Sequence, residues 1–298
     1  MILTGYLFIS LSCVLWGLLG PVAELLYRSG FNASDVVFFR LFGVFLIGFI
    51  TLFRDIRYLY FKRLFYPLLL FALFTIVEWF SFFTSVKLNG IFISVLLLYT
   101  APFFITIFAK YIFKEKLTKW LIFCVILGFF GIILLFITSY DSKSINPGIT
   151  MIFGLISGIS YAINSIFGKY FSNYILPLKL TLYRFSTATL IYFPFVSFNI
   201  FFRKYSFHNI MEIFYLIFFP VIIAYFLFYY GLSRVEISKA AVFTFIEPLV
   251  GSVAAIVFFK ETLGYKLIGA TFILFGIFGT LLNPVLASRK INWLNGKK

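Results

Sequence analysis

One pattern occurs twice in this chain, and its two copies lie 146 positions apart. The stretch APFFITIFAKYIFKEKL carries Pro102 and Glu115, and the stretch EPLVGSVAAIVFFKETL carries Pro248 and Glu261. In each copy thirteen positions separate the proline from the glutamate, the ending Phe-Lys-Glu-x-Leu is shared, and a Gly-x-x-Gly step follows. The repeat predicts two halves of similar fold.

The composition indicates that both halves lie in a lipid bilayer. Apolar residues make up 62% of the chain, charged residues 12%, and the mean hydropathy is +1.06, which leaves too little polar surface for a soluble globule. Apolar runs of about twenty residues, the length that spans hydrocarbon, recur throughout. The expected helices cover 4–23, 34–53, 64–85, 90–113, 119–138, 148–168, 178–200, 212–232, 237–259 and 265–284.

These ten spans give five to each half, and the odd number fixes how the halves are related. If each half folds alike, the second enters the membrane from the opposite side, so the repeats are inverted. The predicted fold is all-α, with ten transmembrane helices in two inverted five-helix repeats. We expect the repeats at 1–140 and 148–286 and a basic tail at 287–298. Inverted repeats with a site between them are a recurrent design of secondary transporters.

The basic residues indicate an orientation. Fifteen of the 25 Lys and Arg residues fall in loops on the side of the N-terminus, seven fall on the other side, and three lie within helices. This bias predicts a multi-pass protein of the cell membrane with both termini in the cytoplasm. Because the charge of +15 is spread over short loops, it argues against nucleic-acid binding.

Two carboxylates fall at mid-helix depth, where an ionisable residue costs on the order of 3 kcal/mol and usually faces an interior path. They are Glu78 in FTIVEWFSF and Glu247 in FTFIEPLVG, and the repeat offset places alanine opposite each. Either carboxylate could bind a substrate amine or a coupling proton. The alternative is a protonated glutamate that bonds a neighbouring helix.

Aromatic residues next to these carboxylates are candidates for a cation site. Trp79 and Tyr225 occupy equivalent repeat positions beside Glu78 and its counterpart, and aromatic faces attract an ammonium group. Packing is the alternative role. Asn164 is a further candidate because an amide within a span needs an interhelical partner. The candidate substrate-binding residues are Glu78, Trp79, Tyr99, Asn164, Tyr225, Glu247 and Trp16.

Two prolines and two arginines are candidates for gating or hinge residues. Pro102 and Pro248 each remove a backbone hydrogen bond, so their helices should kink, as hinges or merely as shape. For Arg40 and Arg184 the favoured interpretation is snorkelling to headgroups, with gating pairs or attraction of a substrate carboxylate as alternatives. The Lys-Glu pair in each repeat copy is expected to end a helix and fix a loop.

The order of these motifs resembles the EamA-type permeases of the drug/metabolite transporter superfamily over essentially the whole chain. Trp16-Gly17 lies in the first helix, arginines stand in FFRLFGVFL and LYRFSTATL, and YTAPFF and FIEPLV precede the two Lys-Glu pairs. The second half departs from the pattern, with Tyr161-Ala162 aligned to Trp16-Gly17. The resemblance implies efflux or exchange of small metabolites, often amino acids, by alternating access.

Other classes of function fit the sequence less well. His208, the only histidine, falls in a loop, and the two cysteines have no metal spacing, so neither an embedded enzyme nor a cofactor is expected. A receptor leaves the inverted repeats unexplained. We therefore predict a permease that exports small metabolites, with amino acids the favoured class. Proton-coupled multidrug or organic-cation efflux is the alternative, and the protein is a monomer or homodimer.

Overall fold

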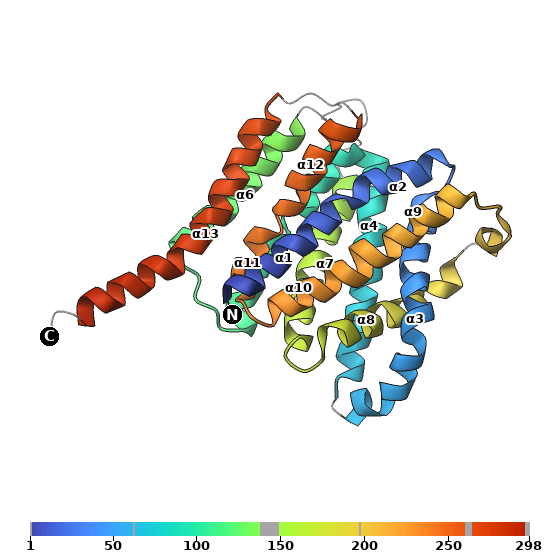
Figure 1. Cartoon of the computed structure of the whole chain (residues 1–298), viewed down its shortest axis with the longest axis horizontal. Helices are drawn as coiled ribbons and strands as arrows, with labels where there is room; N and C mark the ends of the chain where they lie inside the picture. Colours follow the sequence, from blue (N-terminus) through green and yellow to red (C-terminus); the bar gives the residue numbers. More distant parts are fainter. Residues whose placement is uncertain (1, 62, 138–148, 197, 260–263, 296–298) are drawn as a thin grey trace.

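The computed structural model describes residues 2–61, 63–137, 149–196, 198–259 and 264–295, and all regular structure in these ranges is helical. The helices pack side by side in one bundle, with α6 and α13 paired at one edge (Figure 1). In chain order they are α1 Ile2–Gly17, α2 Leu19–Arg28, α3 Ala33–Phe61, α4 Phe65–Leu98, α5 Ala101–Ile112, α6 Lys119–Phe136, α7 Ile149–Phe171, α8 Pro177–Tyr192, α9 Phe207–Ile217, α10 Ala224–Leu232, α11 Ile237–Phe243, α12 Ile246–Phe259 and α13 Lys266–Asn295.

Ten helical segments correspond to the ten predicted spans. Within the described ranges, eight segments are long and apolar enough to cross a membrane: 2–28, 33–60, 65–86, 93–112, 119–136, 151–171, 207–232 and 237–258. The other two are α8 and the part of α13 at 266–282. The sequence of α8 contains many polar residues that are buried against neighbouring helices, so its hydropathy is low although it lies inside the bundle.

Several predicted boundaries were wrong for local reasons. The segment predicted at 178–200 leaves the α-helix at Tyr192, because Pro194 follows in a short 3-10 turn. The span predicted from 212 begins at Phe207, where Ser206 and Asn209 form a reciprocal cap. Helix α3 continues past residue 53 to Phe61, because charged side chains beyond the apolar run do not stop a helix.

Helix α4 contains the reversal that was predicted between the third and fourth spans. The helical run is continuous from Phe65 to Leu98, yet the hydroxyls of Ser85 and Ser94 lie 2.8 Å apart in a hydrogen bond. In a straight helix nine residues span about 13.5 Å. The chain therefore folds back on itself between these serines, and α4 supplies two antiparallel arms.

Equivalent helices of the two halves run antiparallel, as inverted repeats require. Helix α3 meets α8 with Ser34 bonded to Tyr192 at one end and Asp55 bonded to Lys179 at the other. Helix α6 meets α13 so closely that a Cβ on Gly131 would lie 2.7 Å from the Gly269 carbonyl oxygen.

The remaining contacts between the halves join helices that are not equivalent in the two repeats. Helix α1 of the first half packs on α10 of the second, and α7 of the second packs on α4 of the first. Just before α10, in the π-helical segment Phe218–Ile223, the Pro220 carbonyl accepts a hydrogen bond of 2.8 Å from the Trp16 indole of α1. In the second pair, the ring of Phe71 stacks on that of Phe171. The interior of the molecule is thus built from both halves.

Both repeat prolines stand just after a break in a span. Helix α5 begins at Ala101 after a turn at 99–100, with Pro102 in its first turn, and α12 begins at Ile246 after a turn at 244–245, with Pro248 in its first turn. The helix is interrupted next to both prolines, where the kinks were predicted. Their use as hinges stays a prediction.

The Lys-Glu pair of the first copy fixes a loop, as expected. The Glu115 carboxylate accepts hydrogen bonds from the backbone nitrogens of Ile237 at 2.8 Å and Ser238 at 3.0 Å, so it caps the start of α11 in the other half. Lys169 donates to the carbonyls of Leu232 and Val235 just before it. The second pair, Lys260-Glu261, lies outside the described residues.

Helix α13 extends beyond the bundle at its C-terminal end (Figure 1). It runs to Asn295, through most of the stretch that was expected to be a basic tail at 287–298. The predicted span had ended at 284, where apolar residues give way to polar ones. As in α3, helical structure continues past the apolar run.

Candidate functional site

Charged side chains lie inside the bundle where the two halves meet. Arg40 on α3, Glu78 on α4 and Arg184 on α8 are 5%, 6% and 2% exposed. Burial of charge in an apolar bundle is costly unless the groups pair or bind a ligand. This buried cluster is the candidate site.

Glu78 joins the two halves. Its Oε2 accepts a hydrogen bond of 2.5 Å from the side-chain amide of Asn164 on α7. Both residues are buried, and the Asn164 Oδ1 has no hydrogen-bond partner among the described residues. The structure thus supplies the interhelical partner that was expected for Asn164, and that partner is the carboxylate of the other half.

Arg184 is held on several sides. Its Nε donates to Thr75 Oγ1 and its Nη1 to the Tyr229 hydroxyl, both at 2.7 Å. The guanidinium carbon lies 4.3 Å from the ring centre of Phe71 and 4.8 Å from that of Tyr225. Snorkelling was the favoured interpretation for this arginine, and it is wrong, because the side chain is enclosed by α4, α8 and α10.

Arg40 is also buried, so the snorkelling interpretation is wrong here too. Its guanidinium carbon lies 3.9 Å from the centre of the Trp79 ring. Within the described part of the chain its Nε has no hydrogen-bond partner. The inward position follows from packing of α3 against α8, because the face of α3 that carries Arg40 is covered by protein rather than lipid.

The two arginines occupy repeat-equivalent environments. Arg40 and Arg184 are 144 positions apart, and the rings that they contact, Trp79 and Tyr225, are 146 positions apart. Phe185 connects the two rings, since it stacks on Trp79 at 5.6 Å and meets Tyr225 edge-on at 4.8 Å. The structure brings both predicted aromatic candidates into the buried cluster.

Three further predicted residues, Trp16, Tyr99 and Glu247, lie near the buried cluster. Trp16 contacts Tyr225, with ring centres 4.8 Å apart. Glu247, partly buried at the start of α12, interacts electrostatically with Tyr99, Glu78 and Arg40. The backbone of α1 approaches this point closely, because a Cβ on Gly17 would lie 2.6 Å from the Glu247 carbonyl oxygen. Glu247 thus extends the buried cluster toward α1 and α5.

Sequence reasoning missed the four residues that contact Arg184 in the buried cluster: Phe71, Thr75, Phe185 and Tyr229. A signal for three of them was present. Phe71 and Thr75 precede Glu78 by seven and three positions, and Tyr229 follows Tyr225 by four, which places each on the same helix face as a predicted residue. Phe185 gave no such signal among 46 phenylalanines.

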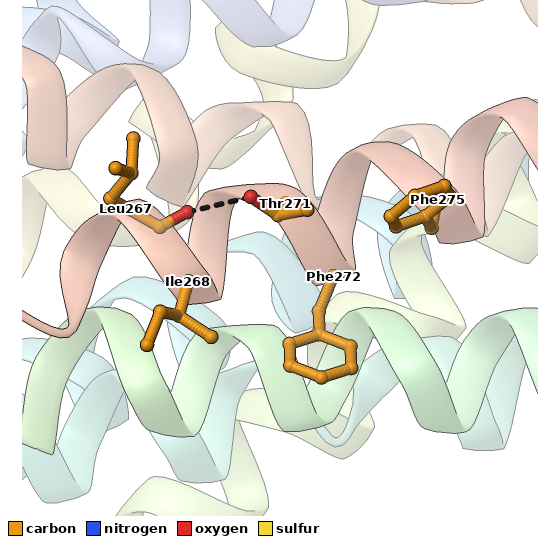
Figure 2. Close-up of a pocket in the computed structure, with 5 residues that line it drawn as sticks. All are labelled: Leu267, Ile268, Thr271, Phe272 and Phe275. Carbon is orange, nitrogen blue, oxygen red and sulfur yellow. Dashed lines mark hydrogen bonds between the residues drawn. The ribbon is translucent and has the colours of Figure 1, made fainter.

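A groove of about 340 Å³ on α13 is a poorer candidate. Its lining is apolar apart from Thr271, and the Thr271 hydroxyl donates to the Leu267 carbonyl of its own helix at 2.9 Å (Figure 2). Such a lining suits acyl chains better than a polar solute. None of the predicted site residues lines this groove.

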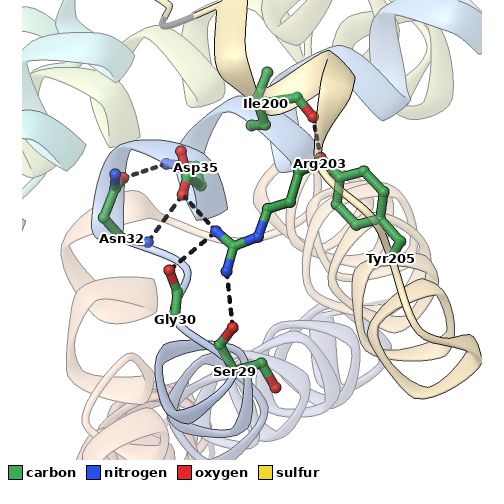
Figure 3. Close-up of polar contacts among 7 residues, drawn as sticks. All are labelled: Ser29, Gly30, Asn32, Asp35, Ile200, Arg203 and Tyr205. Carbon is green, nitrogen blue, oxygen red and sulfur yellow. Dashed lines mark hydrogen bonds and ion pairs between the residues drawn. The ribbon is translucent and has the colours of Figure 1, made fainter.

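A polar contact ties the halves at one end of α3 and α8. Arg203 donates to the carbonyls of Ser29 at 2.8 Å and Gly30 at 3.0 Å and lies 3.9 Å from an oxygen of Asp35 (Figure 3). Gly30 has φ +82°, and a Cβ there would lie 3.0 Å from the arginine, so glycine suits this turn. With the Asp55–Lys179 pair at the far end, this contact holds α3 and α8 around the buried cluster.

Comparison with known proteins gives a consistent result for both halves. The model of the EamA-like transporter family matches residues 3–137 and 148–282. An uncharacterized transporter of Archaeoglobus fulgidus is 28% identical over 261 residues, which cover 87% of this chain and 91% of that protein. A second uncharacterized transporter of the same organism is 26% identical over 179 residues, which cover 60% and 63% of the two chains.

One solved structure, described only as a crystal structure of a protein, has a similar fold. It covers 96% of this chain and 98% of its own, with a TM-score of 0.73 and 16% sequence identity. At that identity the likeness concerns the fold alone.

Proposed function

Because the chain belongs to the EamA-like transporter family, we propose that it exports small metabolites by alternating access, with amino acids as the favoured class. A transporter of this family is a multi-pass membrane protein with a small-molecule substrate, and it is not an enzyme. The class of substrate, the direction and the site are our proposal.

The observation that carries the proposal is the bond between Glu78 and Asn164 at 2.5 Å. It lies in the interior, it joins the inverted halves, and it is accompanied by Arg40 and Arg184. Ionisable residues within a membrane bundle typically mark a substrate or ion pathway, and sites between inverted repeats lie near the midplane. The buried cluster contains ionisable residues within the bundle, and it lies between the two repeats.

We assign roles by chemistry. Glu78 and Glu247 offer negative charge to a substrate amine or a coupling proton, and the rings of Trp79 and Tyr225 add cation–π attraction. Trp16, Tyr99 and Asn164 complete the lining. The breaks beside Pro102 and Pro248 are the proposed hinges that change access to the buried cluster.

Proton-coupled efflux of organic cations is the second candidate. The two carboxylates favour it, because a proton released as a cation binds would give exchange. Two buried arginines do not favour it, since positive charge repels a cationic substrate. The pair of arginines is therefore the reason to place amino acids first.

The proposed orientation has both termini in the cytoplasm of a cell membrane. It rests on the fifteen basic loop residues of one side against seven of the other. The proposed repeat units remain 1–140 and 148–286, with residues 287–298 as the cytoplasmic end.

Counterflow in proteoliposomes tests the proposed function. Labelled amino acids and organic cations are offered to the unmodified chain and to the variants Glu78→Gln and Glu247→Gln. Glu236→Gln serves as the control, because Glu236 is an exposed carboxylate just before α11. Amino acid exchange that is lost in Glu78→Gln and kept in the control supports the proposal. Exchange of cations alone moves the function to multidrug efflux, and no exchange of any solute contradicts transport through this chain.

A further inference from the structure

The two repeat-equivalent arginines differ in how they are held, and this difference assigns them different tasks. We propose that Arg40 binds the carboxylate group of the transported solute, whereas Arg184 is a positioning residue that holds the neighbouring side chains in place. The inference rests on the proposed function and deepens it, because it requires the solute to be a carboxylate and not merely an amine.

Arg184 is held by more contacts than Arg40. Two of its nitrogens are bonded, one to Thr75 of the first half and one to Tyr229 of the second, and only its Nη2 has no partner among the described residues. Aromatic rings from α4, α8 and α10 lie within 5 Å of its guanidinium carbon. Movement of this side chain toward a solute would break contacts in both halves at once.

Arg40 makes no hydrogen bond through its buried Nε to any described residue. Among the described residues, the Trp79 ring lies over one face of the planar guanidinium, with the guanidinium carbon 3.9 Å from the ring centre. The N–H donors of a guanidinium lie along its edges. Because the Trp79 ring covers a face of the Arg40 guanidinium, the N–H groups along the edge can still donate two hydrogen bonds to a planar carboxylate.

The burial of Arg40 makes its unpaired donor important, because a buried donor cannot bond to bulk water. Arg40 is 5% exposed, and its Nε has no partner among the described residues. A buried donor without an acceptor is destabilising, and a buried charged donor more so. A solute carboxylate would supply both the acceptor and the opposite charge.

The charges around Arg40 select a singly charged group. Arg40, Arg184 and Glu78 together carry one net positive charge when all are ionised, which one carboxylate neutralises. A doubly charged phosphate would leave excess negative charge beside Glu78. Glu247, which also interacts electrostatically with Arg40, is the second carboxylate and would pair with the ammonium group of an amino acid.

Counterflow of matched solutes tests this assignment. The probes are the labelled amino acid that the unmodified chain exchanges fastest, and its α-amide, which keeps the ammonium group and lacks the carboxylate. We expect the amide to exchange about tenfold more slowly than the acid or worse. Arg40→Gln should slow exchange of the acid until acid and amide exchange at similar rates, and Arg40→Lys should keep part of the preference.

Arg184→Gln is the matched control from the other repeat. Because it removes a structural contact, we expect it to lower the thermal unfolding temperature and to slow acid and amide alike. Equal exchange of acid and amide by the unmodified chain, or an unchanged acid preference in Arg40→Gln, overturns the inference and leaves the proposed function standing. Absence of exchange for every solute contradicts the proposed function and the inference together.

Discussion

The side-chain amide of Asn164 donates a hydrogen bond of 2.5 Å to Glu78, and the two residues are 86 positions apart in the sequence. One hydrogen bond thus connects the interiors of the two halves. Neither residue has a counterpart of the same type in the other repeat. The inverted halves therefore share a fold while the interior between them is chemically asymmetric. A directional binding site for a solute with two different ends requires this asymmetry.

We expect Asn164→Ala to destabilise the protein by about 1–3 kcal/mol, because it leaves the buried Glu78 carboxylate without its donor. Thermal unfolding of the purified protein in detergent measures the change. Asn173→Ala, in the exposed turn after α7, is the control and should unfold like the unmodified chain. Equal unfolding temperatures for all three proteins would show that the Asn164 bond contributes nothing to stability.

Gly131→Val should destabilise the pairing of α6 with α13 by about 1–3 kcal/mol, because the new side chain meets backbone that cannot yield. Its Cβ would lie 2.7 Å from the Gly269 carbonyl oxygen and 2.7 Å from Ile273 Cγ1. For comparison, Gly20→Val places its Cβ where nothing lies within 4 Å. The unfolding temperature should fall for the first variant and much less for the second. A reversed order would contradict the described packing.

Glu115→Ala should cost about 0.5–2 kcal/mol, the usual effect of losing a helix cap. The carboxylate caps α11 at Ile237 and Ser238, and its negative charge also favours the helix N-terminus. Glu236→Gln, which breaks an exposed pair with Lys239, should change stability by less than about 1 kcal/mol. Denaturant or thermal unfolding separates the two, and similar losses in both variants would refute the capping role.

Pro248→Ala tests whether the break before α12 is a hinge or only a shape. If it is a hinge, restoring a backbone donor should slow counterflow about tenfold while the apparent affinity for the amino acid changes little. Pro102→Ala should act in the same way from the other half. Unaltered exchange rates in both variants would assign the prolines to helix shape alone.

The fold could be predicted from the sequence because the apolar runs are long and the pattern occurs twice. Apolar runs and the 146-residue offset predicted ten spans, and the reversal within α4 was expected between residues 85 and 90. Helix ends were less predictable. At α3 and α13 the apolar pattern reports where the bilayer ends, whereas the helix itself continues through polar residues.

The site was predictable in part. Glu78, Trp79 and Tyr225 were singled out by charge and by repeat position, and they do lie together with Asn164. An inward position of Arg40 and Arg184 was only the alternative to snorkelling, because in a membrane protein the lipid-facing and protein-facing sides of a helix are similarly apolar. Which side an arginine occupies depends on the packing of α3 against α8, and no local pattern encodes that contact.

The most direct test of the account is the rate of amino acid counterflow in Glu78→Gln relative to the unmodified chain, at equal protein incorporation and with unfolding temperatures compared. The substitution keeps the size of the side chain and removes its charge. Because the solute is proposed to bind at the buried cluster, exchange by Glu78→Gln should fall about tenfold or more. Exchange at the unmodified rate by a folded Glu78→Gln protein would contradict this proposal.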